Sequence, residues 1–393
     1  MIKVTSIVKH LFILSFVVYV ISVSWFSWNN MNTYFYIMKH LSALVPAFLF
    51  IFFIFAKPRI SRRLIVLPFL FILIIIPFAL RGITNISEIV IFIQLFLFLL
   101  SAYVFSKFLL HSNVTFSKIE MMSLFIVLLI PPFLDVTFNG GDFIYNTYYG
   151  RPRLLLGFYH PKEAGISLLT AAILFKFYFQ NKISPWKSIL FQLVVIILLH
   201  FMQTRNSLLF YLNFLVINRL LIKVNVTAII FLYFILPIVS LGLLTYLYFE
   251  ELNALTSNRL ELWVKNLDVS LLGKGSSLAD FDKSNVLSKL HVDNFYLEYL
   301  IENGLVFFFL LFVLLCSIVF FIGKRSFNSI YINAVLIPFL IFCFFDAGMF
   351  SSGNFLNLLV WSMVFASFNL EKLKFKKLSL RKSYLVRQEN ISL

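Results

Sequence analysis

Cysteine is almost absent from this chain. The two cysteines among its 393 residues are Cys316 and Cys343, and neither has a second Cys or a His at the spacing of a metal site. This scarcity argues against a thiol-based metal centre. We expect both side chains to be buried and to have no chemical role.

Charged residues are also scarce, at 13% of the sequence, whereas 61% of the residues are hydrophobic and 51 are Phe. A soluble domain of this length could not hide so much apolar surface. The mean hydropathy of +0.94 therefore indicates that lipid is the main solvent. The net charge of +16 would suit nucleic acid only if basic residues clustered on a soluble face, but they lie between apolar runs. We expect a lipid membrane, and no nucleic acid, as a partner.

Long apolar runs recur along the chain, and each could cross a hydrocarbon core of about 30 Å at about 1.5 Å per helical residue. Membrane strands would be shorter and would alternate in polarity. We therefore predict an all-α fold, a polytopic membrane bundle of about twelve transmembrane helices. The predicted spans are 11–28, 41–56, 64–80, 89–106, 119–134, 164–180, 188–203, 207–222, 226–248, 304–322, 329–350 and 354–369. No small-residue cleavage pattern follows the first run, so we expect it to be retained.

The distribution of positive charge predicts the orientation. If both termini are cytoplasmic, two thirds of the 33 Lys and Arg residues fall in inside segments, and every inside loop carries at least two. Of the 17 acidic residues, only Glu120, Glu371 and Glu389 would then lie inside. We expect a multi-pass inner-membrane protein with both termini in the cytoplasm.

The spans and loops divide the chain into six parts. These are N-terminal spans (1–134), a first long periplasmic loop (135–163), central spans (164–249), a large periplasmic loop (250–303), C-terminal spans (304–370) and a basic cytoplasmic tail (371–393). Function concentrates in loops on a rigid scaffold, and the large loop is long enough to fold as a helical cap. No internal repeat is visible, which weakens the case for a transporter built on inverted repeats.

Arginines on the outer side are the exceptions to the positive-inside pattern. Arg205 stands in a short polar hairpin between two apolar spans, where a charge must sit at the membrane surface or in a cavity. We expect it to converge with Arg153 and Arg259 on a lipid-linked diphosphate, because guanidinium forks match phosphate oxygens. The alternative is that Arg205 only extends to lipid headgroups.

The first long loop ends in a segment that mixes cations with aromatic residues, a composition that suits sugars and phosphates together. Its candidate substrate-binding residues are Tyr149, Arg151, Arg153, His160 and Lys162. Alternatively, Tyr148 and Tyr149 belong to an interfacial aromatic belt.

The large loop has candidate residues near both ends. Arg259 and Trp263 lie near its start, and His291, Asp293 and Asn294 lie near its close. His291 or Asp293 could accept a proton, with His160 less suited. The alternatives are that His291 bonds the backbone and that the Asp-Asn pair caps the helix that follows.

Three segments together resemble the O-antigen polymerase and ligase superfamily of bacterial envelope polysaccharide assembly. They are Arg153–Gly165, the Thr204–Asn206 hairpin, and the long loop from Asn258 to Gly304. The resemblance covers about residues 150–310, and the other spans are similar only in hydropathy.

The resemblance implies a metal-independent membrane glycosyltransferase without a cofactor, using undecaprenyl-diphosphate-linked oligosaccharide as donor at the periplasmic face. Ligases of the superfamily tend to carry His-Asn at the close of this loop, whereas this chain has Asp293 before Asn294, which favours a repeat-unit polymerase. A ligase acting on lipid A core is the nearer alternative, and a lipid-linked oligosaccharide flippase is the alternative from another class. A chain-length regulator protein is a candidate partner.

We expect Arg205 and Arg259 to stabilise negative charge on the departing lipid diphosphate, with His291 or Asp293 as the base. The remaining candidates are expected to bind substrate: Tyr149, Arg151, Arg153, His160, Lys162, Trp263 and Asn294.

Overall fold

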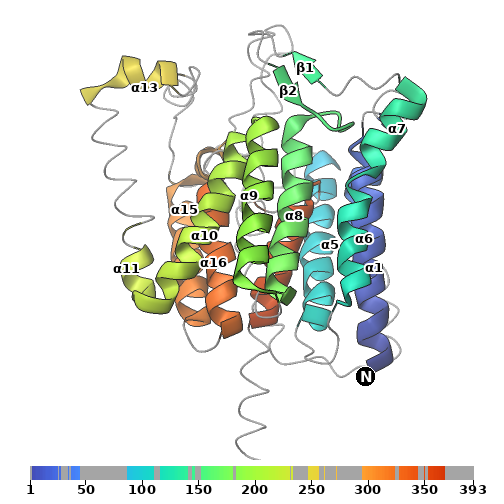
Figure 1. Ribbon diagram of the computed structural model, residues 1–393. Coiled ribbons are helices and arrows are strands. Elements are labelled where there is room, and N and C mark those ends of the chain that lie inside the picture. Colours follow the sequence, from blue (N-terminus) through green and yellow to red (C-terminus); the bar gives the residue numbers. More distant parts are fainter. Residues whose placement is uncertain are drawn as a thin grey trace, which may run out of the picture.

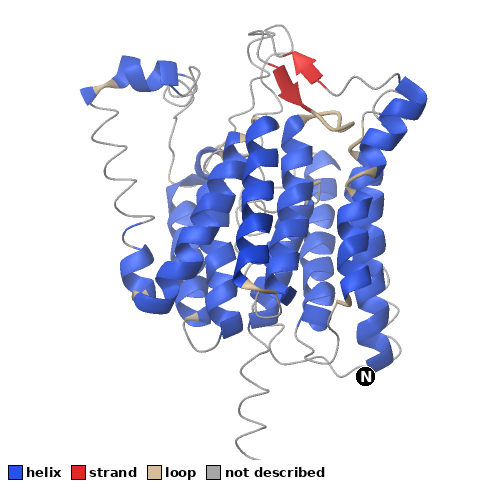
Figure 2. Cartoon of the chain, viewed as in Figure 1, coloured by secondary structure: helices blue, strands red, loops and turns tan. Residues whose placement is uncertain are grey.

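The computed structural model describes residues 2–24, 26–27, 34, 37–44, 86–109, 116–139, 144–146, 152–179, 183–230, 232, 247–255, 261, 271, 294–323, 327–343, 349 and 353–367. Within them, regular structure is helical apart from one short hairpin (Figure 2). The prediction of a helical fold is confirmed for this part of the chain.

Long helices stand side by side with roughly parallel axes (Figure 1). They are α1 (Ile2–Ser22), α5 (Ile86–Leu109), α6 (Lys118–Val127), α8 (Pro161–Phe179), α9 (Pro185–Phe201), α10 (Arg205–Lys223), α15 (Phe295–Ile322), α16 (Phe327–Phe342) and a helix at Phe355–Ser367. The other described helices are α7 (Ile130–Asn139), α11 (Val226–Ile230) and α13 (Phe249–Leu255). Helix α10 packs against α8, α9 and α16, and α1 packs against α5 and α6.

A small antiparallel hairpin covers one end of the bundle (Figure 1). Strand β1 (Ile144–Asn146) pairs with β2 (Pro152–Leu154), and Tyr145 faces Arg153 in the register. We call this end of the bundle the hairpin end, and the end at which α1 begins the opposite end. Helices α8 and α10 begin at the hairpin end, whereas α1, α6 and α9 begin at the opposite end.

Local signals in the sequence explain where several helices begin. Ser117 and Glu120 form a reciprocal capping box at the start of α6, with Glu120 also 2.6 Å from Lys9 Nζ of α1. Helix α9 begins at Pro185, a residue whose fixed φ suits a first helical position. The ion pair of Lys9 with Glu120 holds the first turn of α6 against α1 near the opposite end.

Two predicted boundaries differ from the structure. The span predicted at 119–134 is divided between α6 and α7, and α7 continues to Asn139, into the segment expected to be loop. The span predicted from residue 304 begins earlier, at Phe295, and its helix is broken at Gly304, where φ is 83°. Hydropathy detects the apolar residues after Gly304 but not the more polar helical residues before it. The span was therefore predicted to start too late.

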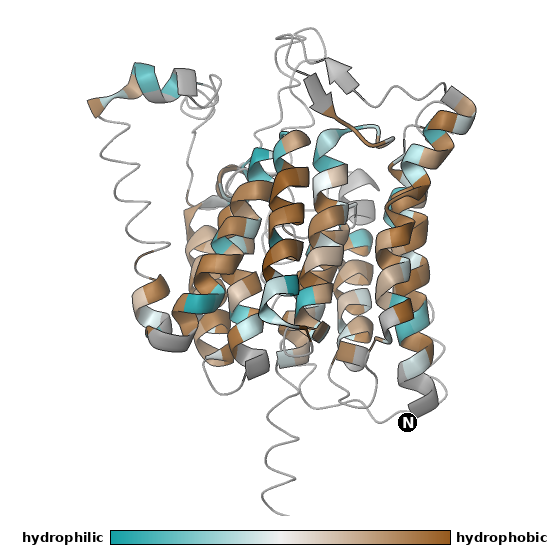
Figure 3. Cartoon of the chain, viewed as in Figure 1, coloured by the Kyte–Doolittle hydropathy of each residue, from teal (hydrophilic) through white to brown (hydrophobic). Residues whose placement is uncertain are grey.

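The helices of the bundle consist mostly of apolar residues (Figure 3). Phe133, Leu190 and Phe309 are 69%, 64% and 63% exposed, and many other large apolar side chains are exposed around the bundle. Water-soluble proteins rarely expose apolar surface on this scale. Two described segments, Ile119–Phe138 and Tyr299–Ile322, are long and apolar enough to cross a membrane.

Other parts of the predicted topology are not covered. The predicted spans 41–56, 64–80 and 226–248 lie wholly or mostly outside the described residues, as do most of the large loop and all of the basic tail. The count of twelve spans therefore stays a prediction.

Candidate functional site

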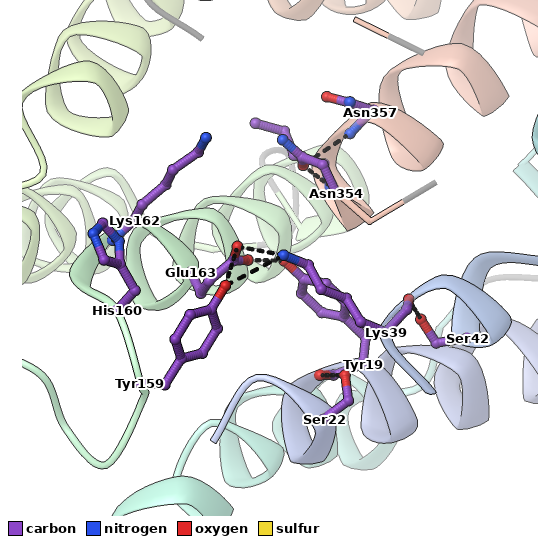
Figure 4. Close-up of polar contacts among 11 residues, drawn as sticks. Tyr19, Ser22, Lys39, Ser42, Tyr159, His160, Lys162, Glu163, Asn354 and Asn357 are labelled. Atoms are coloured by element: carbon purple, nitrogen blue, oxygen red, sulfur yellow. Dashed lines mark hydrogen bonds and ion pairs between the residues drawn. The ribbon is translucent and has the colours of Figure 1, made fainter. Parts of the chain in front are cut away.

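A buried carboxylate lies at the hairpin end, in the first turn of α8. Glu163 is only 5% exposed, and both of its oxygens are bonded. Lys39 Nζ lies 2.7 Å from Oε1, and the Tyr19 hydroxyl donates to Oε2 at 2.5 Å (Figure 4). The Tyr159 hydroxyl donates to Oε1 at 3.3 Å and accepts from Lys39 Nζ at 3.4 Å. We call Tyr19, Lys39, Tyr159 and Glu163 the Glu163 cluster.

The members of the cluster come from segments far apart in the sequence. Tyr19 belongs to α1, Lys39 to a helical segment at 37–44, and Glu163 to α8, with Tyr159 in the loop just before α8. Tyr159 is held in turn by its backbone N–H, which donates to the Val23 carbonyl at 3.2 Å. The cluster therefore joins three separate helical segments at one end of the bundle.

The loop before α8 is shaped by Gly157. Its φ is +73°, and a Cβ at this position would lie 2.3 Å from the carbonyl carbon and oxygen of Pro131. Both the backbone conformation and the close contact require glycine. Gly157 thus lets the chain pass tightly over α7 and deliver Tyr159 to the cluster.

Glu163 is charged at neutral pH although it is buried. Burial raises the pKa of its carboxyl, but the positive charge of Lys39 and the hydrogen bonds from Lys39 and Tyr19 outweigh burial, so the pKa lies below its ordinary value of 4.5. The carboxylate also lies in the first turn of α8, where the helix dipole favours negative charge. The cluster is therefore a buried ion pair with its oxygens satisfied by hydroxyl groups.

His40, next to Lys39, is packed against the start of the last described helix. A Cβ on Gly353 would lie 2.9 Å from His40 Cε1 and 3.3 Å from Lys39 Cε. Burial and the charge of Lys39 lower the pKa of His40, against a smaller opposing effect of Glu163. His40 is thus held neutral beside the ion pair.

His160 and Lys162 are exposed just outside the cluster. The backbone N–H of Lys162 donates to His160 Nδ1 at 3.1 Å. Because Nδ1 accepts this bond, the neutral imidazole carries its proton on Nε2 and presents a donor rather than a base. While this bond is in place, His160 is disfavoured as the proton acceptor, and its binding of substrate stays a prediction.

Gly165 brings the beginnings of α8 and α10 into direct contact. A Cβ at Gly165 would lie 2.7 Å from Ser207 Oγ and 2.8 Å from Thr204 Oγ1, so a side chain there would push the two helices apart. Arg205, the first residue of α10, is exposed, as is Lys162 in the first turn of α8. Two helix N-termini and two cations therefore share the hairpin end, which is a favourable setting for an anion.

Asn294 has the capping role that the sequence allowed. Its Oδ1 accepts from the backbone N–H groups of Tyr296 at 3.1 Å and Leu297 at 3.2 Å, at the start of α15. The helix start is attached to the end of α16, since Phe295 N donates to the Cys343 carbonyl at 3.0 Å. Asn294 is buried and its observed role is to cap the helix, while its binding of substrate stays a prediction.

The other predicted site residues cannot be placed in the same way. Arg153 is described as part of β2 without its side chain. Six more predictions fall outside the described residues: Tyr149, Arg151, Arg259, Trp263, His291 and Asp293. The structure therefore brings Arg205 together with the segment of His160 and Lys162, while the proposed convergence with Arg153 and Arg259 stays a prediction.

The Glu163 cluster itself was not predicted from the sequence. Lys39 precedes a predicted span on the outer side, where Lys is unusual, and Glu163 directly precedes another span. The unusual outer Lys39 and the acidic residue at the start of a span were the only available signals for the cluster. Tyr19 gave none, because a Tyr within an apolar run resembles any interfacial aromatic residue.

Among the described residues, no three His, Cys, Asp or Glu side chains are grouped as metal ligands. Searches of protein-family profiles, characterised proteins and solved structures find no match to this chain.

Proposed function

We propose that this chain is a bacterial inner-membrane protein of about twelve spans, with both termini in the cytoplasm and the hairpin end facing the periplasm. The apolar outer surface of the helices supports the membrane setting. Lys39, Lys162 and Arg205 all lie at the end that this orientation assigns to the outside, while Lys9, Lys176 and Arg219 lie toward the other end.

We further propose that the protein is a surface-polysaccharide polymerase. It transfers a glycan from undecaprenyl diphosphate to a lipid-linked repeat unit at the hairpin end. The observation that carries the proposal is the contact of Gly165 with Thr204 and Ser207. This contact joins two of the segments that resemble the O-antigen polymerase and ligase superfamily, and it sets Lys162 and Arg205 at the same end.

The chemistry is a displacement at the anomeric carbon of the donor sugar. A hydroxyl of the acceptor repeat unit attacks this carbon, the bond to the diphosphate oxygen breaks, and the hydroxyl proton passes to a base. Negative charge grows on the leaving diphosphate, so fixed cations stabilise the transition state more than the ground state. Arg205 is assigned to this charge, with Arg259, Arg151 and Arg153 as further candidates, and His291 or Asp293 as the base.

The Glu163 cluster has a positioning role in this proposal. Glu163 is fully engaged by Lys39 and the two tyrosines, and it is nearly inaccessible. It fixes the first turn of α8 against α1, and so fixes where His160 and Lys162 stand. A rigid surround of this kind keeps binding groups in productive geometry.

The test is complementation of polysaccharide synthesis in cells that lack the native protein. Arg205→Ala should reduce chains of many repeats by on the order of 100-fold or more, while the protein still inserts in the membrane. Arg205→Lys should also be impaired, because a Lys cannot form the paired contact of a guanidinium. Lys187→Gln, at the opposite end, is the control and should leave the glycan ladder unchanged.

Two results would refute the proposal in different ways. A normal ladder in Arg205→Ala would remove Arg205 from the site. Glycan attached to lipid A core, without longer lipid-linked chains, would identify a ligase instead of a polymerase.

A further inference from the structure

The opposite end of the bundle contains two neighbouring cations. Lys176, near the end of α8, is only 8% exposed, and its Nζ lies 4.9 Å from the centroid of the buried Phe214 ring. Arg219, near the end of α10, is exposed and is close enough for its charge to repel that of Lys176. Each of these two positive charges raises the energetic cost of the other unless an anion lies nearby.

No carboxylate in the described part of the chain supplies that anion. The two ion pairs among the described residues are Lys9 with Glu120 and Lys39 with Glu163, and neither includes Lys176 or Arg219. In the proposed orientation the cytoplasmic side has few acidic residues, and Glu120 is already paired. Within the described residues, no side chain provides the counter-charge for Lys176 and Arg219, so an anion bound at this end would stabilise both cations.

A cavity beside Arg219 has the lining expected for a lipid. It measures about 280 Å³ and lies between α9 and α10. It is lined by Gln192, Leu215, Val216, Arg219 and Leu220. Val216 is 47% exposed on the outer face of α10, so the cavity borders the surface that faces the bilayer. A hydrocarbon chain fits the apolar wall, and a phosphate fits the guanidinium.

The depth of the cavity agrees with a headgroup contact. Trp186 and Lys187 are exposed in the first turn of α9, at the same end of the bundle. Exposed Trp and Lys side chains mark the level of the lipid headgroups. Arg219 lies about one helical turn from the end of α10, so its guanidinium can reach the same level.

We propose that the cavity between α9 and α10 binds one anionic phospholipid of the leaflet at the opposite end. Its phosphate contacts Arg219, and an acyl chain lies along Leu215 and Val216. Lys176 stands behind Arg219 and adds positive potential. The site is remote from the hairpin end, so this proposal does not depend on the glycosyl-transfer chemistry.

The test is lipid binding by the full chain, followed by native mass spectrometry in detergent. Phosphatidylglycerol should bind with a defined stoichiometry, and phosphatidylcholine with the same acyl chains should bind more weakly. Arg219→Gln should weaken phosphatidylglycerol binding about fivefold, the effect of one basic side chain near an anionic headgroup. Lys187→Gln removes another exposed cation at the same end, outside the cavity, and should weaken phosphatidylglycerol binding clearly less than Arg219→Gln does.

Three outcomes would overturn the proposal. They are equal binding of the two lipids, equal weakening by Lys187→Gln and Arg219→Gln, and displacement of phosphatidylglycerol by inorganic phosphate. The last would assign the cations to a free anion. Arg219 is exposed, so its replacement leaves folding intact, and Lys176→Met is a second variant expected to weaken binding in the same direction.

Discussion

Lys39 and Glu163 should make strongly coupled contributions to the free energy of unfolding. The two side chains are 13% and 6% exposed, and Nζ lies 2.7 Å from Oε1. Removing one partner of such a buried pair costs about 3–5 kcal/mol, because the other charge stays buried without compensation. Lys39→Met and Glu163→Gln should each destabilise the protein by about this amount.

The double variant should be much less damaged than the sum of the single variants. With both charges gone, the uncompensated charge is gone too, and the amide introduced by Glu163→Gln would retain a hydrogen-bond acceptor for Tyr19. We expect a coupling free energy of about 2 kcal/mol or more, to be measured by equilibrium unfolding of the four proteins in mixed detergent micelles.

The pair of Lys9 and Glu120 provides a matched control. It is as short, at 2.6 Å, but its side chains are 11% and 21% exposed. The two lysines are similarly buried, but Glu120 is more exposed than Glu163 and keeps more of its hydration, so the coupling free energy of this pair should be smaller than that of Lys39 and Glu163. Effects of the single variants at Lys39 and Glu163 that add to within about 0.5 kcal/mol would refute the assignment of a buried pair in which each charge compensates the other.

Three further predictions concern pH dependence, helix contact and helix capping. Because the pKa of Glu163 is lowered on folding, its stabilising effect is complete above its ordinary value of 4.5 and is lost as the pH falls through the folded-state value. Melting temperatures between pH 7 and pH 3 should therefore fall more steeply for the unmodified protein than for Glu163→Gln, and parallel curves would contradict this. Gly165→Val should destabilise by about 1–3 kcal/mol through the contact with Ser207 and Thr204, and Gly165→Ala should be milder. Asn294→Ala should cost about 1 kcal/mol in unfolding experiments through loss of the cap of α15, whereas Asn294→Asp should retain most of it; equal losses would exclude capping.

Hydropathy and capping signals were sufficient to predict much of the fold. The spans predicted at 89–106, 188–203 and 207–222 lie within or close to α5, α9 and α10, because each is a continuous apolar run between polar segments. The cap at Asn294 was also predictable, since Asn before an apolar run favours that position. The break at Gly304 was not, because an apolar window averages across it.

The site was predictable only where its residues were local. His160, Lys162 and Arg205 stand beside predicted span ends, and the structure places all of them at the hairpin end. Their neighbours depend on long-range packing: Tyr19 and Glu163 are 144 residues apart in the sequence. Similarly, only the packing of α8 on α10 reveals why Gly165 must lack a side chain. A single sequence contains no signal for such contacts.

The most direct test of the central claim is reconstitution of the purified protein with lipid-linked repeat units. The account predicts that the repeat units are joined into longer lipid-linked chains, that free lipid diphosphate is released in proportion, and that Arg205→Ala suppresses both. Repeat units that cross the bilayer, or stay unchanged, with no release of lipid diphosphate would contradict it.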